Sequence, residues 1–288
     1  MSKLPEPRQN IAAIIDQHHE KNDKPFREHL GISLLGHPCD RYLWLSFRWA
    51  IAPVFPGRML RLFRRGHLEE DTVIADLKAI GCVLNERQTR VDFGSFVSGS
   101  CDGIITSGLP GHENKKFVLE IKTHSKKSFD ELLKKGVQLA KEQHYIQMQG
   151  YMLGMGLDRA LYYAVCKDDD RIYTEIVRLE HDIAQKYIER GKKIAMSDYM
   201  PEPISADASW YQCKMCNFHE FCHESHITKE VNCRTCALSS AATDSEFQCL
   251  RHDNADIPAP WQRNGCPGHV LHPDLVPYER AESGSEFE

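Results

Sequence analysis

The cysteines of this chain are distributed unevenly, and their grouping restricts how its C-terminal part can fold. Of eleven cysteines in 288 residues, seven lie between positions 213 and 266. Clustered cysteines in a reducing compartment are typical of metal ligands, whereas disulfides form in oxidising compartments. We therefore expect a long first part with an ordinary core and a last part that depends on bound metal. Cys82, Cys101 and Cys166 stand in apolar contexts and are expected to be buried thiols.

The remaining composition is typical of a globular protein with one sizeable core. Hydrophobic residues make up 41% of the chain, enough for one core and a small appendage. No apolar run reaches the roughly 18–20 residues of a membrane span, and the first residues, MSKLPEPRQN, lack the apolar stretch of a signal peptide. We therefore expect a cytoplasmic protein with no membrane partner. Because the formal charge is −5, nucleic acid would have to bind at a local patch.

The order of periodic patterns between residues 61 and 200 predicts an α/β fold. A helix is followed by three strands, a helix, two strands and a helix, which favours a central mixed sheet flanked by helices. The segment before it, 1–60, is expected to be mainly helical, and the polar tail 281–288 is expected to be disordered. The predicted helices are 61–77, 138–157 and 182–196, and the predicted strands are 83–92, 96–106, 116–122, 160–167 and 172–179.

Two neighbouring predicted strands carry charged residues where apolar ones are expected. Asp102 ends one apolar run in SGSCDG, and Glu120 and Lys122 lie in the next, VLEIK. Residues two apart on a strand share a face, so the lysine lies beside the glutamate. Two carboxylates on paired strands can bind one Mg²⁺ or Mn²⁺ ion, and a lysine beside them can activate water or offset phosphate charge. The alternative is a surface Glu-x-Lys pair on an edge strand.

Two predicted helices add polar residues that suit the same chemistry. Gln147 and Tyr151 stand four apart in YIQMQGY, so they share a helix face and can offer an amide and a phenol to a DNA backbone. His67 and Glu70, in RRGHLEED, could supply a further metal ligand from the first helix. Each of these two could equally be a surface residue.

The motifs RGHLEE, GSCDG, EIK and QMQGY, in this order, resemble the RecB-like branch of the PD-(D/E)XK nucleases over about residues 60–180. The resemblance implies a restriction-endonuclease-like core and a metal-dependent DNA exonuclease acting on DNA ends or single strands. It places such a protein in DNA recombination, repair or phage DNA processing, in a bacterial or phage-infected cell. Asp102 and Glu120 would bind Mg²⁺ or Mn²⁺ with His67, while Glu70 is an additional acidic candidate. Lys122 would be the catalytic lysine, and Gln147 and Tyr151 would position the substrate strand. Cys101 replaces the usual proline of this family.

The first group of C-terminal cysteines, Cys213, Cys216 and Cys222, supplies three thiolates and needs a fourth ligand. A local histidine, His219, His223 or His226, would complete a zinc site. Cys39, in HPCDRYLWLSF, is the distant alternative. A cysteine before the core and three after it resemble the iron–sulfur nucleases, including AddB and the RecB-like nucleases of CRISPR adaptation. That resemblance implies a [4Fe–4S] cluster bound by Cys39, Cys213, Cys216 and Cys222.

The second group lies in NCRTC, FQCLRHD and NGCPGH, where Cys233-x2-Cys236 has the spacing of a zinc ribbon. We expect Cys233, Cys236, Cys249 and Cys266 to bind a structural Zn²⁺ ion, with His252 or His269 as alternative ligands. Too few apolar residues surround these cysteines for a core of their own, so metal would supply much of the folding energy.

Because the chain lacks a P-loop motif, any helicase or recombination partner would be a separate polypeptide. Two other functions remain open: a nuclease-fold protein that binds nucleic acid without cutting it and carries structural zinc, and a zinc-ribbon binding protein with incidental acidic residues. The expected division of the chain is 1–60 helical segment, 61–200 nuclease core, 201–228 iron–sulfur clasp, 229–280 zinc module and 281–288 tail.

Overall fold

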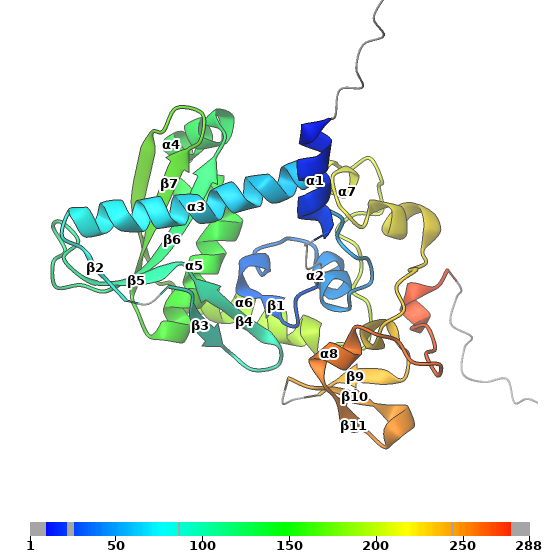
Figure 1. Ribbon diagram of the computed structural model, residues 1–288. Coiled ribbons are helices and arrows are strands. Elements are labelled where there is room, and N and C mark those ends of the chain that lie inside the picture. The colour runs from blue at the N-terminus through cyan, green and yellow to red at the C-terminus, as the bar shows by residue number, and fades with distance from the viewer. Residues whose placement is uncertain (1–9, 22–25, 86, 243–244, 278–288) are drawn as a thin grey trace, which may run out of the picture.

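The computed structural model of the chain describes residues 10–21, 26–85, 87–242 and 245–277, so the expected disordered tail lies outside it. The architecture is mixed α/β, with helices on the faces of mixed sheets (Figure 1). Among the described helices, none combines the length and the apolar character needed to cross a lipid bilayer.

The largest sheet has five strands in the order β2-β5-β6-β7-β8. β6 and β7 run parallel, while the other neighbours are antiparallel, so the sheet is mixed, as the sequence predicts. Its strands are β2 (Val83–Leu84), β5 (Gly103–Ser107), β6 (Phe117–His124), β7 (Arg159–Cys166) and β8 (Ile172–Arg178).

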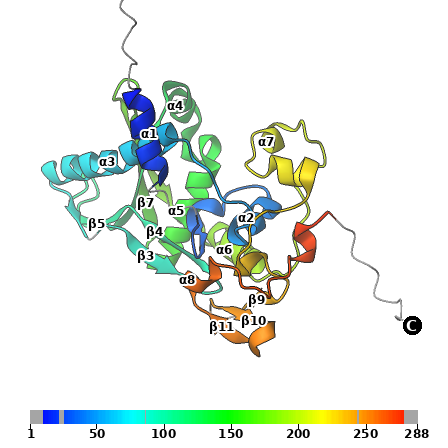
Figure 2. The same ribbon diagram turned by 45° about the vertical axis from the view of Figure 1, so that its right-hand side comes forward.

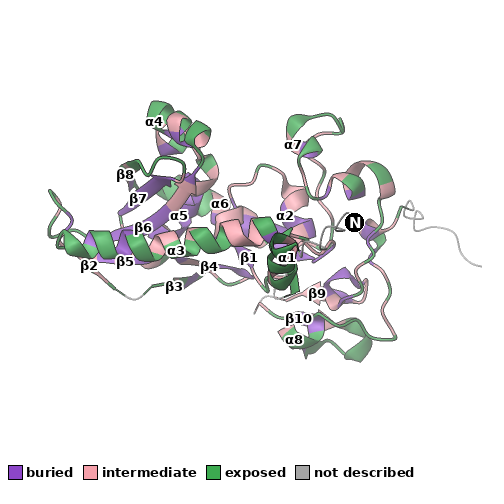
Figure 3. Ribbon diagram, turned by 45° about the horizontal axis from the view of Figure 1, so that its top comes forward, coloured by how far each residue is buried: buried purple, intermediate pink, exposed green. Residues whose placement is uncertain are grey.

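Side chains along β6 alternate between the two faces of this sheet, and a different helix packs on each face. Leu119 and Ile121 are buried in one cluster with Leu77 of α3 (Gly57–Ala79), which crosses this face in Figure 1. Val118 belongs to the cluster on the other face, with Met148 of α5 (Glu142–Met155). Glu120 lies two residues after Val118 on the same strand face, so its carboxylate lies in the layer between the sheet and α5. Figure 3 shows β6 and β7 buried and the outer surface of α3 exposed.

A second sheet has three strands in the order β1-β4-β3, namely β1 (Leu30–Gly31), β4 (Val97–Cys101) and β3 (Thr89–Asp92). The sequence predicts single strands at 83–92 and 96–106, but each is divided between the two sheets. The second division falls at Asp102, which lies between β4 and β5 and outside both strands. This residue therefore stands where the chain passes from one sheet to the other.

The helices differ from the expected ones mainly before and after β6. The first core helix begins at residue 57 rather than 61. The helix expected at 138–157 corresponds mainly to α5, which begins after Lys141, while most of α4 (Lys126–Ala140) is not expected from the sequence. The helix expected at 182–196 is confirmed as α6 (His181–Ala195). In the N-terminal segment, the helices are α1 (Ile11–Lys21), the turn η1 (Ile32–Leu34) and α2 (Asp40–Phe47).

The cysteine-rich part packs on the side of α2 that lies away from the five-stranded sheet (Figure 2). It contains a third sheet, in the order β11-β10-β9, and several short helices and turns. Phe247 and Ile257 of this sheet are buried in the same cluster as Phe47 of α2. Its elements are α7 (Tyr211–Lys214), η2 (Phe221–Ser225), η3 (Cys233–Thr235), β9 (Ser239–Ala241), β10 (Phe247–Cys249), η4 (Leu250–His252), β11 (Ala255–Ile257), α8 (Ala259–Gln262) and η5 (Pro273–Leu275).

Candidate functional site

Asp102 lies beside Glu120 because β5 and β6 pair, as the candidate site requires. Gly103, the first residue of β5, is the partner of Leu119 in the antiparallel ladder. Asp102 accepts a hydrogen bond from the backbone N–H of Ile121, with 2.7 Å between nitrogen and Oδ2. The bend between the two sheets thus brings a carboxylate against the middle of β6.

Glu120 is a completely buried carboxylate with an unsatisfied oxygen. Its side chain has no exposed surface, and Lys122 Nζ contacts its Oε1. Oε2 has no hydrogen-bond partner among the described residues. Burial raises the pKa of Glu120 to about 8, although Lys122 opposes this rise, and the negative charge of Asp102 adds to it. An unsatisfied buried oxygen is unfavourable without a further partner, and a cation would satisfy it.

Lys122 remains charged in this environment. Its side chain is 27% exposed. Burial alone would lower the pKa of Lys122, but the charges of Glu120 and Asp102 outweigh burial and raise it. An ammonium group therefore lies beside the carboxylates at neutral pH.

Of the two candidates on α3, Glu70 faces the carboxylates and His67 faces outward. The Glu70 side chain is only 14% exposed, and burial, together with the negative charge of Asp102, raises its pKa. His67 is 75% exposed and contacts the site through Glu70, with 3.3 Å between Nδ1 and Oε1. Arg87 Nη2 lies 3.2 Å from Glu70 Oε2 and holds that side chain from the other direction.

Three carboxylates, from α3, from β6 and from the bend between β4 and β5, therefore lie near one lysine. Within the described part of the chain, however, no three His, Cys, Asp or Glu side chains are arranged so that they could already hold a metal ion. The donor set still fits a hard cation, because it consists of carboxylate oxygens, one of them buried and unpaired.

Gln147 and Tyr151 lie on the face of α5 that covers this group. Gln147 Nε2 lies 3.5 Å from the Tyr151 hydroxyl, and both side chains are buried. Burial and the charge of Glu120 raise the pKa of Tyr151, and Asp102 adds to this rise. Gly99 of β4 makes room for the phenol, since a Cβ there would lie 3.0 Å from its hydroxyl.

A chain of hydrogen bonds beside Lys122 was not expected from the sequence. His124 Nε2 lies 2.8 Å from the hydroxyl of Tyr162, and His144 Nδ1 lies 2.9 Å from the same oxygen. Burial, with the charges of nearby lysines including Lys122, lowers the pKa of His124 to about 4 and that of His144 to about 3. Both imidazoles are therefore neutral. His124 could have been suspected, because it lies two residues beyond Lys122 on the same strand face.

The four cysteines of the first group line one cavity, together with His37, His219 and His223. Cys39 is the N-cap of α2, and its sulfur accepts a hydrogen bond from Tyr42 N at 3.4 Å. The sulfur of Cys216 accepts a similar bond from Phe218 N at 3.4 Å. The group consists of Cys39, Cys213, Cys216 and Cys222.

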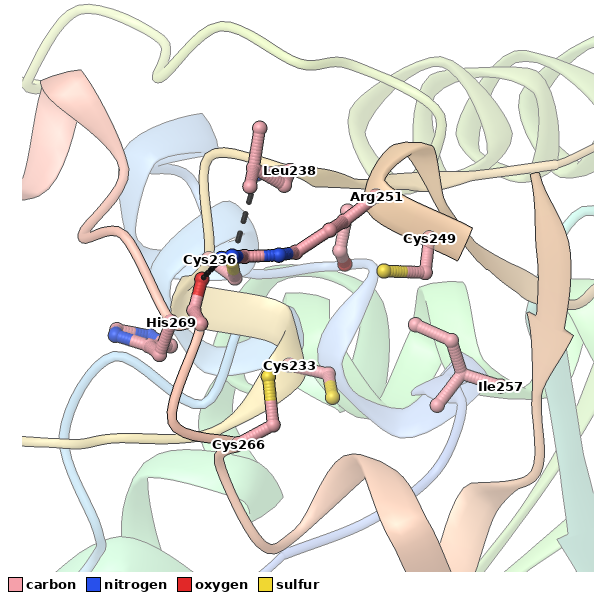
Figure 4. A pocket seen from close by; sticks show the side chains of 10 residues that line it. Cys233, Cys236, Leu238, Cys249, Arg251, Ile257, Cys266 and His269 are labelled. Atoms are coloured by element: carbon pink, nitrogen blue, oxygen red, sulfur yellow. Dashed lines mark hydrogen bonds between the residues drawn. The ribbon is translucent and has the colours of Figure 1, made fainter. Parts of the chain in front are cut away.

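The four cysteines of the second group, Cys233, Cys236, Cys249 and Cys266, line a separate cavity (Figure 4). The remaining three, Cys82, Cys101 and Cys166, are buried, as expected.

Comparison with known proteins gives only distant likenesses. No family model matches the chain, and no curated protein matches it. The crystal structure of SSO0001 has a TM-score of 0.47 and 18% identity, covering 73% of this chain and 95% of the other. An alkaline exonuclease from Laribacter hongkongensis has a TM-score of 0.44 and 14% identity, covering 58% and 86%. A phage-related exonuclease from Haemophilus somnus 129PT has a TM-score of 0.34 and 21% identity, covering 45% and 66%. At these values, none of the likenesses assigns an activity to this chain.

Proposed function

We propose that this chain is a Mg²⁺- or Mn²⁺-dependent deoxyribonuclease that hydrolyses phosphodiester bonds, and that it acts as an exonuclease of the RecB-like type. The observation that carries the proposal is the buried, unsatisfied oxygen of Glu120, placed between Asp102 and Lys122 at the junction of two sheets. A purely structural Glu–Lys pair would leave no such oxygen unpaired.

Asp102, Glu120 and Glu70 would hold the ion, with His67 as a further ligand or as a support for Glu70. The bound metal supplies an acidified water and offsets negative charge on the phosphate. Lys122, charged at neutral pH, orients that water or stabilises charge developing on the phosphate oxygens. Tyr151 and Gln147 lie on the α5 side and are proposed to position the substrate strand.

The substrate proposed is DNA, at ends or in single strands, in recombination, repair or phage DNA processing, with any helicase as a separate partner. The alternative is a nuclease-fold protein that binds nucleic acid without cutting it. Lys122 supports cleavage over binding alone, because a charged ammonium beside the carboxylates could orient a water or stabilise charge on the phosphate.

The test is cleavage of end-labelled single-stranded, double-stranded and circular DNA in Mg²⁺, Mn²⁺ or EDTA. Lys122→Ala is compared with Lys193→Ala, which removes an exposed lysine of α6. We expect cleavage by the wild type and Lys193→Ala only, and only with metal, while the circle remains intact. Cleavage by Lys122→Ala at the wild-type rate would show that this group is not the active site. DNA binding without cleavage under any metal would favour the alternative.

We further propose that the first cysteine group binds a [4Fe–4S] cluster. The group joins α2, before the core, to the segment after it, so a cluster would fasten the two ends of the fold together. Arg41 of α2 also reaches this segment, donating to the carbonyl of Pro201 at 2.7 Å. Anaerobically purified protein should contain iron and sulfide and show broad visible absorbance, which Cys39→Ser should lose. A colourless protein with zinc in these cysteines would instead support a site completed by His219 or His223.

A further inference from the structure

The second cysteine group is brought together from four places in the C-terminal part. Cys233 begins the turn η3 and Cys236 follows it, Cys249 ends β10, and Cys266 lies in the loop after α8. All four line one cavity, and Figure 4 shows the side chains of Cys233, Cys249 and Cys266 directed into the same space. Four thiols from positions up to 33 residues apart in the sequence therefore lie around one cavity.

The turn between Cys233 and Cys236 has hydrogen bonds that prepare it for a metal. Cys236 N donates to the Cys233 carbonyl at 3.1 Å, and Leu238 N donates to the sulfur of Cys236 at 3.4 Å. The turn of the first group repeats this pattern, from Cys216 N to the Cys213 carbonyl at 3.0 Å and from Phe218 N to the sulfur of Cys216. A backbone N–H aimed at sulfur favours the thiolate, which is the form that binds metal.

The histidines near this cavity are poorer ligands than the cysteines. His269 lines the cavity, but its Nε2 lies 3.2 Å from the hydroxyl of Thr235. His252 is not among the residues that line the cavity. Four thiolates around one divalent ion leave two negative charges, and Arg251 reaches across the cavity to offset them. Its Nη1 donates to the Gly268 carbonyl at 3.1 Å (Figure 4).

The same turn carries a buried arginine that holds the N-terminal segment. Arg234 stands between the two cysteines and is only 1% exposed. It donates to the Phe47 carbonyl at 3.0 Å and to the Glu28 carbonyl at 2.7 Å. Its guanidinium lies 4.0 Å from the centre of the Trp49 ring. A buried guanidinium is stable only while such partners stay in place.

Neighbouring residues of the turn hold the backbone of residues 47–50 in an unusual conformation. Asn232 Nδ2 donates to the Trp49 carbonyl at 3.3 Å, and Thr228 donates to the Ala50 carbonyl. Trp49 has φ of 53°, which is strained for a large side chain. The strained backbone persists because the hydrogen bonds from Asn232 and Thr228 hold it in place.

We propose that Cys233, Cys236, Cys249 and Cys266 bind one Zn²⁺ ion as a tetrathiolate, and that this ion keeps Arg234 docked against residues 47–50. Thiolates in this number select zinc or iron–sulfur over hard cations, and a closed four-sulfur set is a structural zinc site. The proposal is independent of the nuclease chemistry, because none of these residues belongs to the acidic site.

The metal assignment is tested by measuring zinc and iron per chain in full-length protein purified without oxygen. Cys249→Ser should lose one equivalent of zinc and keep the visible absorbance of the first group. Cys82→Ala, which alters a buried thiol elsewhere, should keep both. Wild-type protein without zinc, iron in place of zinc at these cysteines, or a Cys249→Ser variant that keeps all its zinc would overturn the assignment.

The docking role is tested on wild-type protein, so it does not depend on whether a variant folds. Zinc is displaced with a mercurial, release is followed with a colorimetric chelator, and amide hydrogen exchange is measured before and after. Peptides covering residues 47–50 should exchange at least about tenfold faster after release, while peptides covering β7 should be unchanged. Zinc release without faster exchange at 47–50 would contradict the docking role.

Discussion

Glu120 of β6 and Tyr162 of β7 are partners in the parallel ladder, so a buried carboxylate and a buried phenol lie side by side beneath α5. Burial and the charge of Glu120 raise the pKa of Tyr162, which keeps its hydroxyl protonated. That hydroxyl lies within hydrogen-bond distance of His124 and His144. The register of β6 and β7 therefore places a neutral group of one phenol and two imidazoles next to the acidic site.

Tyr162→Phe should destabilise the protein by about 1–3 kcal/mol, because it leaves a buried and a half-buried imidazole nitrogen without their partner. It should also lower the rate of DNA cleavage by altering the packing around Lys122. Tyr163→Phe is the matched control, since Tyr163 lies on the same strand but faces α3. Urea unfolding of both variants gives the comparison. Equal losses would mean that the histidine contacts contribute nothing specific.

Glu120→Gln should remove most of the stabilisation that bound Mn²⁺ gives to the folded protein. In EDTA, the stability of the variant should differ little from that of the wild type, because the amide keeps the size of the side chain and an oxygen that can accept a hydrogen bond from Lys122. Saturating Mn²⁺ should stabilise the wild type by about 2–3 kcal/mol at a hundred times Kd, and the variant much less. DNA cleavage should fall roughly a hundredfold or more. Thermal unfolding with and without Mn²⁺ measures the first effect, and equal Mn²⁺ stabilisation of both proteins would contradict it.

Glu70→Gln should weaken binding of the catalytic metal more than His67→Ala does, because Glu70 is the buried member of the pair. We expect about a tenfold rise in the Mg²⁺ concentration needed for half-maximal cleavage by Glu70→Gln, and a smaller rise for His67→Ala. Metal titrations of the cleavage rate decide between the two residues. A larger effect of His67→Ala would make the histidine the direct ligand, as the family resemblance implies.

The stability contributed by His124 should decrease as the pH falls below about 6.5, while the raised pKa of Glu120 contributes in the opposite direction over the same range, so the histidine effect is measured as the difference between wild type and histidine variants. The pKa of His124 is lowered from 6.5 to about 4 by burial and by the charges of Lys141, Lys122 and Lys167. The unfolded chain therefore takes up a proton near pH 6.5, while the folded chain does so only near pH 4. Between these values, stability is lost on acidification, on the order of 2–3 kcal/mol for this residue. His144 changes in the same direction.

The pH effect is measured by urea unfolding between pH 7.5 and about 4.5. His124→Asn and His144→Asn should each flatten the dependence, even if both variants are less stable throughout. An unchanged slope in the double variant would show that other groups cause the loss.

Removal of residues after 228 should unfold the protein rather than yield a minimal nuclease. The deletion removes Phe247, whose ring lies 5.7 Å from that of Phe47 and 5.3 Å from that of Phe96. It also removes Arg234 and the contacts that it makes with the N-terminal segment. A single buried Phe→Ala change costs about 3–5 kcal/mol, so the deletion exceeds the stability of most domains. A truncated protein with the wild-type melting temperature would contradict this expectation.

The sequence alone determined those features that depend on local periodicity and spacing. Glu120 and Lys122 share a face because they stand two apart on a strand, and the mixed sheet follows from the order of strands and helices. Short spacings identify Cys213, Cys216 and Cys222 as one set and Cys233 and Cys236 as another, while the family resemblance assigns Cys39 to the first set; in the structure each set of four lines one cavity.

Only the tertiary structure decided features that depend on how distant segments pack. The strand expected at 96–106 breaks at Asp102 because its two halves join different sheets. Glu70, rather than His67, faces Asp102 because the rotation of α3 is set by its packing on the sheet. Tyr162 meets two histidines from other elements, and Arg234 docks on Trp49, 185 residues earlier in the chain. No local pattern encodes these contacts, since their free energy comes from burial and hydrogen bonds that exist only once the chain has folded.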